Sequence, residues 1–198
     1  MEISVIVPCY NSENYILETL QSIISQDDNN LQIILVDDGS IDNTSKIAHS
    51  VLRKKDLYLH QDNLGVASAR NLGISHATGR FISFIDSDDI AYAEKFRKCI
   101  DVLNSNLNIA GCGHRMNYMN SKSKIQGSTP ATKFSQDDIK LAKIMPFPFS
   151  SFVCKSDELK KVGFLNESLL GGEDLDIISR LSHNGKIVII PEVLGAYR

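Results

Sequence analysis

The sequence predicts one α/β domain with a mostly parallel central sheet and helices on both faces of that sheet. Apolar runs typical of buried strands alternate with helical patterns four times by residue 104. Such alternation is typical of parallel strands joined by right-handed crossover helices. The length of 198 residues fits one domain of ordinary size with a sizeable core.

The first 104 residues supply the regular part of this pattern. Ile16, Leu20 and Ile23 recur at the spacing of one helix face, and the small residues Ala69 and Gly73 allow a later helix to pack closely on a sheet. We expect strands at 3–7, 31–36, 57–60 and 81–85, and helices at 13–24, 43–52, 66–77 and 92–103.

The second half of the chain is less regular. We expect strands at 108–112, 151–154 and 186–191, helices at 157–162 and 173–183, and a polar surface excursion at 117–138. One domain therefore spans 1–198, with halves at 1–104 and 105–198. The chain stops at Arg198 without a turn or cap. We expect a truncated C-terminus, whose missing segment could associate peripherally with a membrane.

Composition excludes several classes of protein. The chain is 42% hydrophobic and 23% charged, as in soluble globular proteins, and its net charge of -3 argues against broad nucleic-acid binding. The four cysteines are scattered, which favours reduced thiols over disulfides or a zinc site. Apolar runs fall far short of the roughly 18 residues of a membrane span. We therefore expect a cytoplasmic protein, with peripheral attachment at the inner face of the membrane left open.

Acidic residues follow two of the expected strands. Asp37 and Asp38 end the second strand, and the run Asp86-Ser87-Asp88-Asp89 ends the fourth. The carboxyl ends of parallel strands lie on one rim, where α/β sheets bind ligands. Carboxylates there suit a hard divalent cation, which could in turn hold a diphosphate. If the strand stays extended past Ile85, Asp86 and Asp88 point the same way. The alternative is a solvated acidic turn.

A third acidic pair, Glu173-Asp174, opens the last helix after Gly171-Gly172. Asp174 lies on the same helical stripe as the apolar residues Ile177, Ile178 and Leu181. A carboxylate at that inner corner is a candidate general base, and the alternative is a carboxylate that caps the helix. The two glycines leave the preceding loop free to approach a ligand closely.

Other site signatures are absent from the sequence. None of the five histidines pairs at metal-ligand spacing, and no Gly-x-Ser-x-Gly elbow, phosphate-binding loop or Gly-x-Gly-x-x-Gly motif occurs. Arg70 lies in a helix that follows Gly65, and it is either a solvent-facing arginine or a ligand contact.

Taken in order, these motifs resemble those of family 2 glycosyltransferases, which have the GT-A (Rossmann-like) nucleotide-diphospho-sugar transferase fold. The resemblance spans residues 3–198. It rests on Val5-Ile6-Val7-Pro8-Cys9-Tyr10-Asn11, on Val36-Asp37-Asp38-Gly39-Ser40, on Asn63-Leu64-Gly65 through Arg70-Asn71, on Asp86-Ser87-Asp88-Asp89 as a DxD motif, and on Gly172-Glu173-Asp174.

The resemblance implies a role for each matching residue. Asp174 would be the catalytic base, and Asp88 with Asp86 would bind Mn²⁺ or Mg²⁺ at the diphosphate. Asp37 would accept a hydrogen bond from a uracil imino group. The nucleotide-binding residues would be Pro8, Tyr10, Asp37, Arg70, Asp86 and Ser87, and the donor sugar or acceptor would lie near Gly171, Gly172 and Glu173.

The implied reaction is a metal-dependent, inverting transfer of a hexosyl or hexosaminyl group. The donor would be a UDP-linked nucleotide sugar, and the acceptor a glycan or lipid-linked glycan, as in polysaccharide or cell-surface glycan biosynthesis. Residues 1–104 would bind the donor and 105–198 the acceptor, with 119–134 and 145–149 facing it or packing in the core. The family's histidine after the terminal Tyr-Arg is missing. The alternatives are a non-catalytic nucleotide- or glycan-binding domain and a haloacid-dehalogenase-type phosphatase, whose Asp-x-Asp follows the first strand and has Thr or Val where Ile90 stands.

Overall fold

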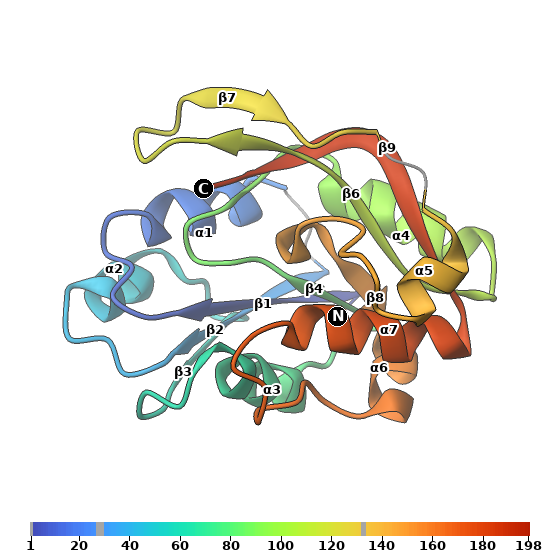
Figure 1. The fold of residues 1–198 in the computed structure, drawn as a ribbon. Helices are drawn as coiled ribbons and strands as arrows, with labels where there is room; N and C mark the ends of the chain where they lie inside the picture. The colour runs from blue at the N-terminus through green and yellow to red at the C-terminus, as the bar shows by residue number, and fades with distance from the viewer. Residues whose placement is uncertain (1, 27–29, 132–133) are drawn as a thin grey trace.

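The computed structural model describes residues 2–26, 30–131 and 134–198. Within these ranges a curled mixed sheet runs through the centre, with helices on both of its faces (Figure 1). The strand order is β3-β2-β1-β4-β8-β6-β9-β5, and β7 pairs with β6. The strands are β1 (Ile3–Cys9), β2 (Leu31–Asp37), β3 (Leu57–His60), β4 (Phe81–Phe84), β5 (Ile90–Ala91), β6 (Ile109–Met119), β7 (Ile125–Ser128), β8 (Val153–Lys155) and β9 (Lys186–Tyr197).

The helices connect these strands and cover them. No helix in the described ranges has both the length and the apolar character needed to cross a membrane. The helices are α1 (Ile16–Ile24), α2 (Thr44–Val51), α3 (Val66–His76), α4 (Lys95–Ser105), α5 (Gln136–Lys140), α6 (Ser156–Val162) and α7 (Glu173–Asn184), with a 3-10 turn, η1 (Phe149–Ser151).

The first half of the chain forms the parallel part of the sheet. β1 pairs in parallel with β2 and with β4, and β2 pairs in parallel with β3. Cys9 lies opposite Asp37 in this register, so the carboxyl ends of β1 and β2 meet at one rim. This arrangement confirms the parallel strands predicted from the alternating pattern, and it places the acidic strand ends together.

The second half closes the sheet with mixed pairings. Every antiparallel pair among the described strands involves β7, β8 or β9, whereas β9 runs parallel to β6. The described part of the segment 117–138 is mostly exposed or half-buried, as expected of a surface excursion, but it is not irregular, because it contains the β6–β7 hairpin and the start of α5. β9 also continues beyond the expected end. A register shift between Ile190 and Val193 leaves Pro191 in a bulge, where its missing N–H costs no ladder bond.

Apolar side chains pack on both faces of the sheet. Ile16, Leu20 and Ile23 of α1 pack with Phe96 of α4 on one face. The other core contains Ile74 of α3 together with residues of α5, α6 and α7. Because helices cover both faces of the sheet, the sequences of the central strands are continuous apolar runs and do not alternate between apolar and polar residues.

Candidate active site

A pocket of about 350 Å³ lies at the rim where β1, β2 and β4 end, beside the start of α3. Four of the predicted nucleotide-binding residues line it together: Pro8, Tyr10, Asp86 and Ser87. The remaining lining residues are Cys9, Asp38, Asn63, Gly65, Val66 and Ala69. The structure therefore brings motifs from three separate strand ends to one cavity, at the position where open α/β sheets bind ligands.

Asp37 does not line this pocket, which corrects the expectation that it contacts a nucleobase directly. Its side chain is 1% exposed. One carboxylate oxygen accepts a 2.6 Å hydrogen bond from the Tyr58 hydroxyl, and the other accepts the backbone N–H of Ser40 at 2.8 Å. Asp37 thus fixes the loop after β2 from the face opposite the cavity.

Asp38 takes the pocket position that sequence reasoning missed. The alternation of side chains along β2 could have predicted this position. Ile34 and Val36 pack toward Ala69 of α3, and Asp38 lies on the same face as these two residues. Its carboxylate accepts the backbone N–H of Gly65 at 2.9 Å, so it also holds the turn before α3. Asp37 and Asp38 therefore lie on opposite faces, and of the two only Asp38 lines the pocket.

Arg70 joins two motifs that lie far apart in the sequence. Its guanidinium donates to Asp86 at 2.7 Å and to Glu173 at 2.8 Å, and it lies 4.7 Å over the ring of Phe149. The residue is only 4% exposed. Arg70 is therefore neither the solvent-facing arginine nor a residue that lines the pocket. Instead it ties the DxD turn to the start of α7.

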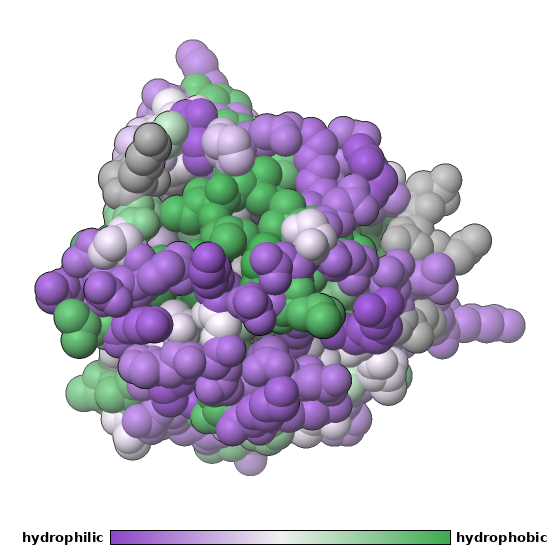
Figure 2. Space-filling model, turned by 90° about the vertical axis from the view of Figure 1, so that its right-hand side faces the viewer, coloured by the Kyte–Doolittle hydropathy of each residue, from purple (hydrophilic) through white to green (hydrophobic). Residues whose placement is uncertain are grey.

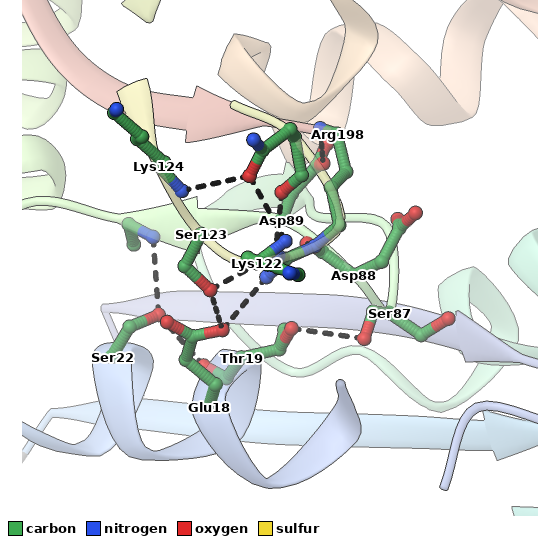
Figure 3. Close-up of polar contacts among 12 residues, drawn as sticks. Glu18, Thr19, Ser22, Ser87, Asp88, Asp89, Lys122, Ser123, Lys124 and Arg198 are labelled. Carbon is green, nitrogen blue, oxygen red and sulfur yellow. Dashed lines mark hydrogen bonds and ion pairs between the residues drawn. The ribbon is translucent and has the colours of Figure 1, made fainter. Parts of the chain in front are cut away.

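The Asp86–Asp89 segment is a turn rather than an extended continuation of β4. The N–H of Asp89 donates to the carbonyl of Asp86 at 3.1 Å, so the alternation argument does not apply here. Burial and the charge of Asp86 raise the pKa of Asp88. Among the described residues, no other side chain bonds the Asp88 carboxylate, and Figure 3 shows it pointing away from the surrounding network.

Arg198, the residue after β9, anchors this turn (Figure 3). Its N–H donates to the Asp89 carboxylate at 3.0 Å, and its Nε donates to the carbonyl of Asp88 at 2.9 Å. Burial and the charge of Asp86 raise the pKa of Asp89 to about 7. Glu18 pairs with the Arg198 guanidinium at 2.7 Å. Asp89 is thus held inside the protein, whereas Asp86 and Asp88 are half-buried.

Ser87 also has a structural role in the turn. Its hydroxyl lies 2.7 Å from that of Ser12, and its carbonyl accepts the Thr19 hydroxyl at 2.9 Å. The backbone of the DxD turn is therefore fixed from the α1 side as well.

Asp174 occupies the first turn of α7 and is half-buried. Ile177, Ile178 and Leu181 are fully buried, which confirms the predicted apolar stripe. One carboxylate oxygen accepts the adjacent N–H of Leu175 at 2.7 Å, a contact that also fits the capping alternative. The preceding Gly171 and Gly172 are exposed, and a Cβ added to either would meet no atom within 4 Å.

The carboxylates fit a cation that is shared with a ligand. No group of three or more His, Cys, Asp or Glu side chains in the described ranges is arranged to hold a metal ion alone. However, Mg²⁺ in nucleotide sites is commonly bound by one or two carboxylates plus phosphate oxygens, and oxygen ligands also suit Mn²⁺. Asp86 and Asp88 supply such a pair beside the pocket.

Both segments expected to face an acceptor contribute to a second cavity of about 370 Å³. Phe134 of the first segment and Phe147 of the second line it, together with Arg115 and Tyr197. Phe147 also stacks on Phe152 at 5.7 Å, so the aromatic stretch is core and pocket wall at once. An adjoining apolar hollow between α5 and β9 is visible in Figure 2.

Solved structures share this architecture. S. aureus TarS in complex with UDP has a TM-score of 0.83 at 22% identity, covering 100% of this chain and 60% of that one. The mannosyltransferase PcManGT from Pyrobaculum calidifontis, in complex with GDP-Man and Mn²⁺, has a TM-score of 0.75 at 20% identity, covering 99% and 56%. The fold is that of the GT-A class of glycosyltransferases.

Sequence comparison identifies the family. The model of glycosyl transferase family 2 matches residues 4–161. An uncharacterized glycosyltransferase of Rickettsia prowazekii is 32% identical over 97% of this chain and 62% of its own length. Glycosyltransferase GlyG of Streptococcus pneumoniae is 33% identical over 83% of this chain and 58% of its own length. Two further Rickettsia glycosyltransferases match over 16% of their lengths. The chain belongs to glycosyl transferase family 2.

Proposed function

We propose that this chain transfers a sugar from a UDP-sugar to a hydroxyl group of a glycan or lipid-linked glycan. The observation that carries the proposal is the bridge formed by Arg70, which unites the DxD turn with the Glu173-Asp174 motif beside the strand-end pocket. A nucleotide in that pocket would extend its diphosphate toward Asp86. The complexes of TarS with UDP and with UDP-GlcNAc support a UDP-linked donor.

Several residues in and beside the pocket have proposed roles in donor binding. Pro8 and Tyr10 contact the nucleobase, while Asp38 holds the turn at Gly65 that borders it. Asp86 and Asp88 hold Mn²⁺ or Mg²⁺ together with the diphosphate, and a cation there neutralises the departing nucleoside diphosphate. The Mn²⁺ in the PcManGT complex supports this choice of metal.

Asp174 is the proposed general base for the acceptor hydroxyl. It directly follows Glu173, which pairs with Arg70, and it comes just after the open loop that contains Gly171 and Gly172. One base that deprotonates the acceptor, without a second carboxylate acting as nucleophile, gives direct displacement and inversion of the anomeric centre. The cavity lined by Phe134 and Phe147 would receive part of the acceptor, and a lipid-linked acceptor would bring the protein to the membrane surface.

The test incubates the protein with a panel of UDP-sugars and Mn²⁺, and measures UDP release with and without candidate acceptors. We expect the wild type to release UDP from one donor. We expect Asp174→Asn to keep donor affinity within about twofold and to lose at least about 100-fold in rate, as expected for a general base. Asp176→Asn on the same helix, whose side chain pairs with Arg180, is the control. Binding without turnover by the wild type would indicate a non-catalytic binding domain instead.

A further inference from the structure

Lys95, the first residue of α4, carries a buried ammonium group near the Asp86–Asp89 turn. Its side chain is 1% exposed, and its Nζ donates a 2.5 Å hydrogen bond to the carbonyl of Ser150. Burial lowers the pKa of Lys95 to about 8, while neighbouring groups that include Asp89 and Asp86 oppose that effect. Burying an ammonium group is costly unless it is hydrogen-bonded and lies near groups of opposite charge.

Ser150 passes the contact on to the acidic turn. Its Oγ accepts the backbone N–H of Asp86 at 2.9 Å, and its hydroxyl opposes the rise that burial and the charge of Asp86 cause in the pKa of Asp89. Ser150 is 2% exposed and cannot exchange these partners for bulk water. Any shift of its main chain would therefore move the backbone at Asp86 directly.

The turn η1, which contains Ser150, also supports Arg70. The ring of Phe149 lies 4.7 Å from the Arg70 guanidinium and stacks on Phe84 at 4.7 Å. η1 belongs to the second half of the chain, whereas Arg70 and Asp86 belong to the first. Lys95 therefore holds the segment at which the two halves meet under the site.

The other titratable groups around Lys95 are consistent with this arrangement. Burial, followed by the charge of Lys95, lowers the pKa of His114 to about 3, so that imidazole adds no second positive charge. The thiols of Cys99 and Cys112 are buried beside it. Cys99, Asp89, Cys112 and Asp86, in that order, oppose the lowering of the Lys95 pKa by burial.

We propose that Lys95 is a positioning residue for the donor site, which acts through Ser150 to hold the Asp86–Asp89 turn in the shape that receives a diphosphate and its cation. The proposal rests on the proposed function, and it assigns to Lys95 no contact with the donor itself. Residues that orient metal-binding carboxylates are commonly as important to affinity as the ligands.

The test titrates UDP into the 198-residue protein by calorimetry with Mn²⁺ present. We expect Lys95→Met and Ser150→Ala each to weaken UDP binding by about 10- to 100-fold. Lys98→Met, one turn further along α4 and paired at the surface with Glu94 and Glu192, should bind as the wild type does. Hydrogen exchange supplies a second readout. In both variants, peptides covering 84–90 should exchange faster than in the wild type, and this increase should exceed that of the rest of the chain.

The outcomes separate the two proposals. If the wild type binds UDP and both variants bind it equally well, the role of Lys95 is refuted and the proposed function stands. A uniform rise in exchange with unchanged affinity would reduce Lys95 to a residue that serves stability alone. No binding by the wild type overturns both proposals. Should Lys95→Met fail to fold, Ser150→Ala tests the link through which Lys95 is proposed to act, because it removes the Oγ that accepts the Asp86 N–H and keeps the carbonyl that Lys95 binds. Unchanged UDP affinity in Ser150→Ala would then refute the proposal.

Discussion

Arg70 illustrates how single residues build this site. Its guanidinium is buried, pairs with carboxylates from two motifs and rests on an aromatic face. A planar fork can satisfy this geometry, whereas a lysine ammonium cannot reach both carboxylates and stack on the ring of Phe149 at the same time. The sequence showed that an arginine stands in the third motif, but its partners lie 16 and 103 residues away. No local pattern reports contacts at such separations.

Arg70→Lys should therefore destabilise the protein by about 1–3 kcal/mol, through the loss of charge-assisted hydrogen bonds in a buried setting. Urea unfolding followed by circular dichroism measures this free energy. Arg97→Lys changes the same residue type on the exposed face of α4 and should stay within about 0.5 kcal/mol of wild type. An equal denaturation midpoint for Arg70→Lys and wild type would contradict the bridging role.

The strand β6 shows how an element shapes both the core and the second cavity. Gly111 and Gly113 lie on one face of β6, and the rings of Phe152 and Phe147 pack directly against them. A Cβ at Gly113 would lie 2.3 Å from the Phe147 ring. Glycine in a strand often marks such close approach. That signal was present in the sequence, but the partner ring was not identifiable from it.

Gly113→Ala should cost about 1–3 kcal/mol of unfolding free energy, because the Phe147 ring must leave its position in the stack. Gly171→Ala is the matched control: a Cβ there meets nothing within 4 Å, so its stability should lie within about 0.5 kcal/mol of wild type. Thermal unfolding of the two variants compares them. Equal melting temperatures would show that the aromatic stack adapts without cost.

At the scale of the whole molecule, the predictable part of the fold was the regular part. The parallel strands of the first half and the common rim of Asp37 and Asp86 followed from apolar runs and alternation. The β6–β7 hairpin escaped prediction because β7 is short and its residues are exposed or half-buried, so no apolar pattern marks it. The tether from Arg198 to Asp88 and Asp89 depends on a strand pairing that closes only in three dimensions.

The central claim is that the acidic rim binds a nucleoside diphosphate through a shared divalent cation. Calorimetric titration of UDP with Mn²⁺ and, separately, with EDTA tests it most directly. We expect at least about tenfold tighter binding with Mn²⁺, as for a metal that links carboxylates to a diphosphate. Asp88→Asn should abolish that difference, and the exposed Asp101→Asn should preserve it. Equal affinity with Mn²⁺ and with EDTA, or no binding of UDP in either condition, would contradict the account.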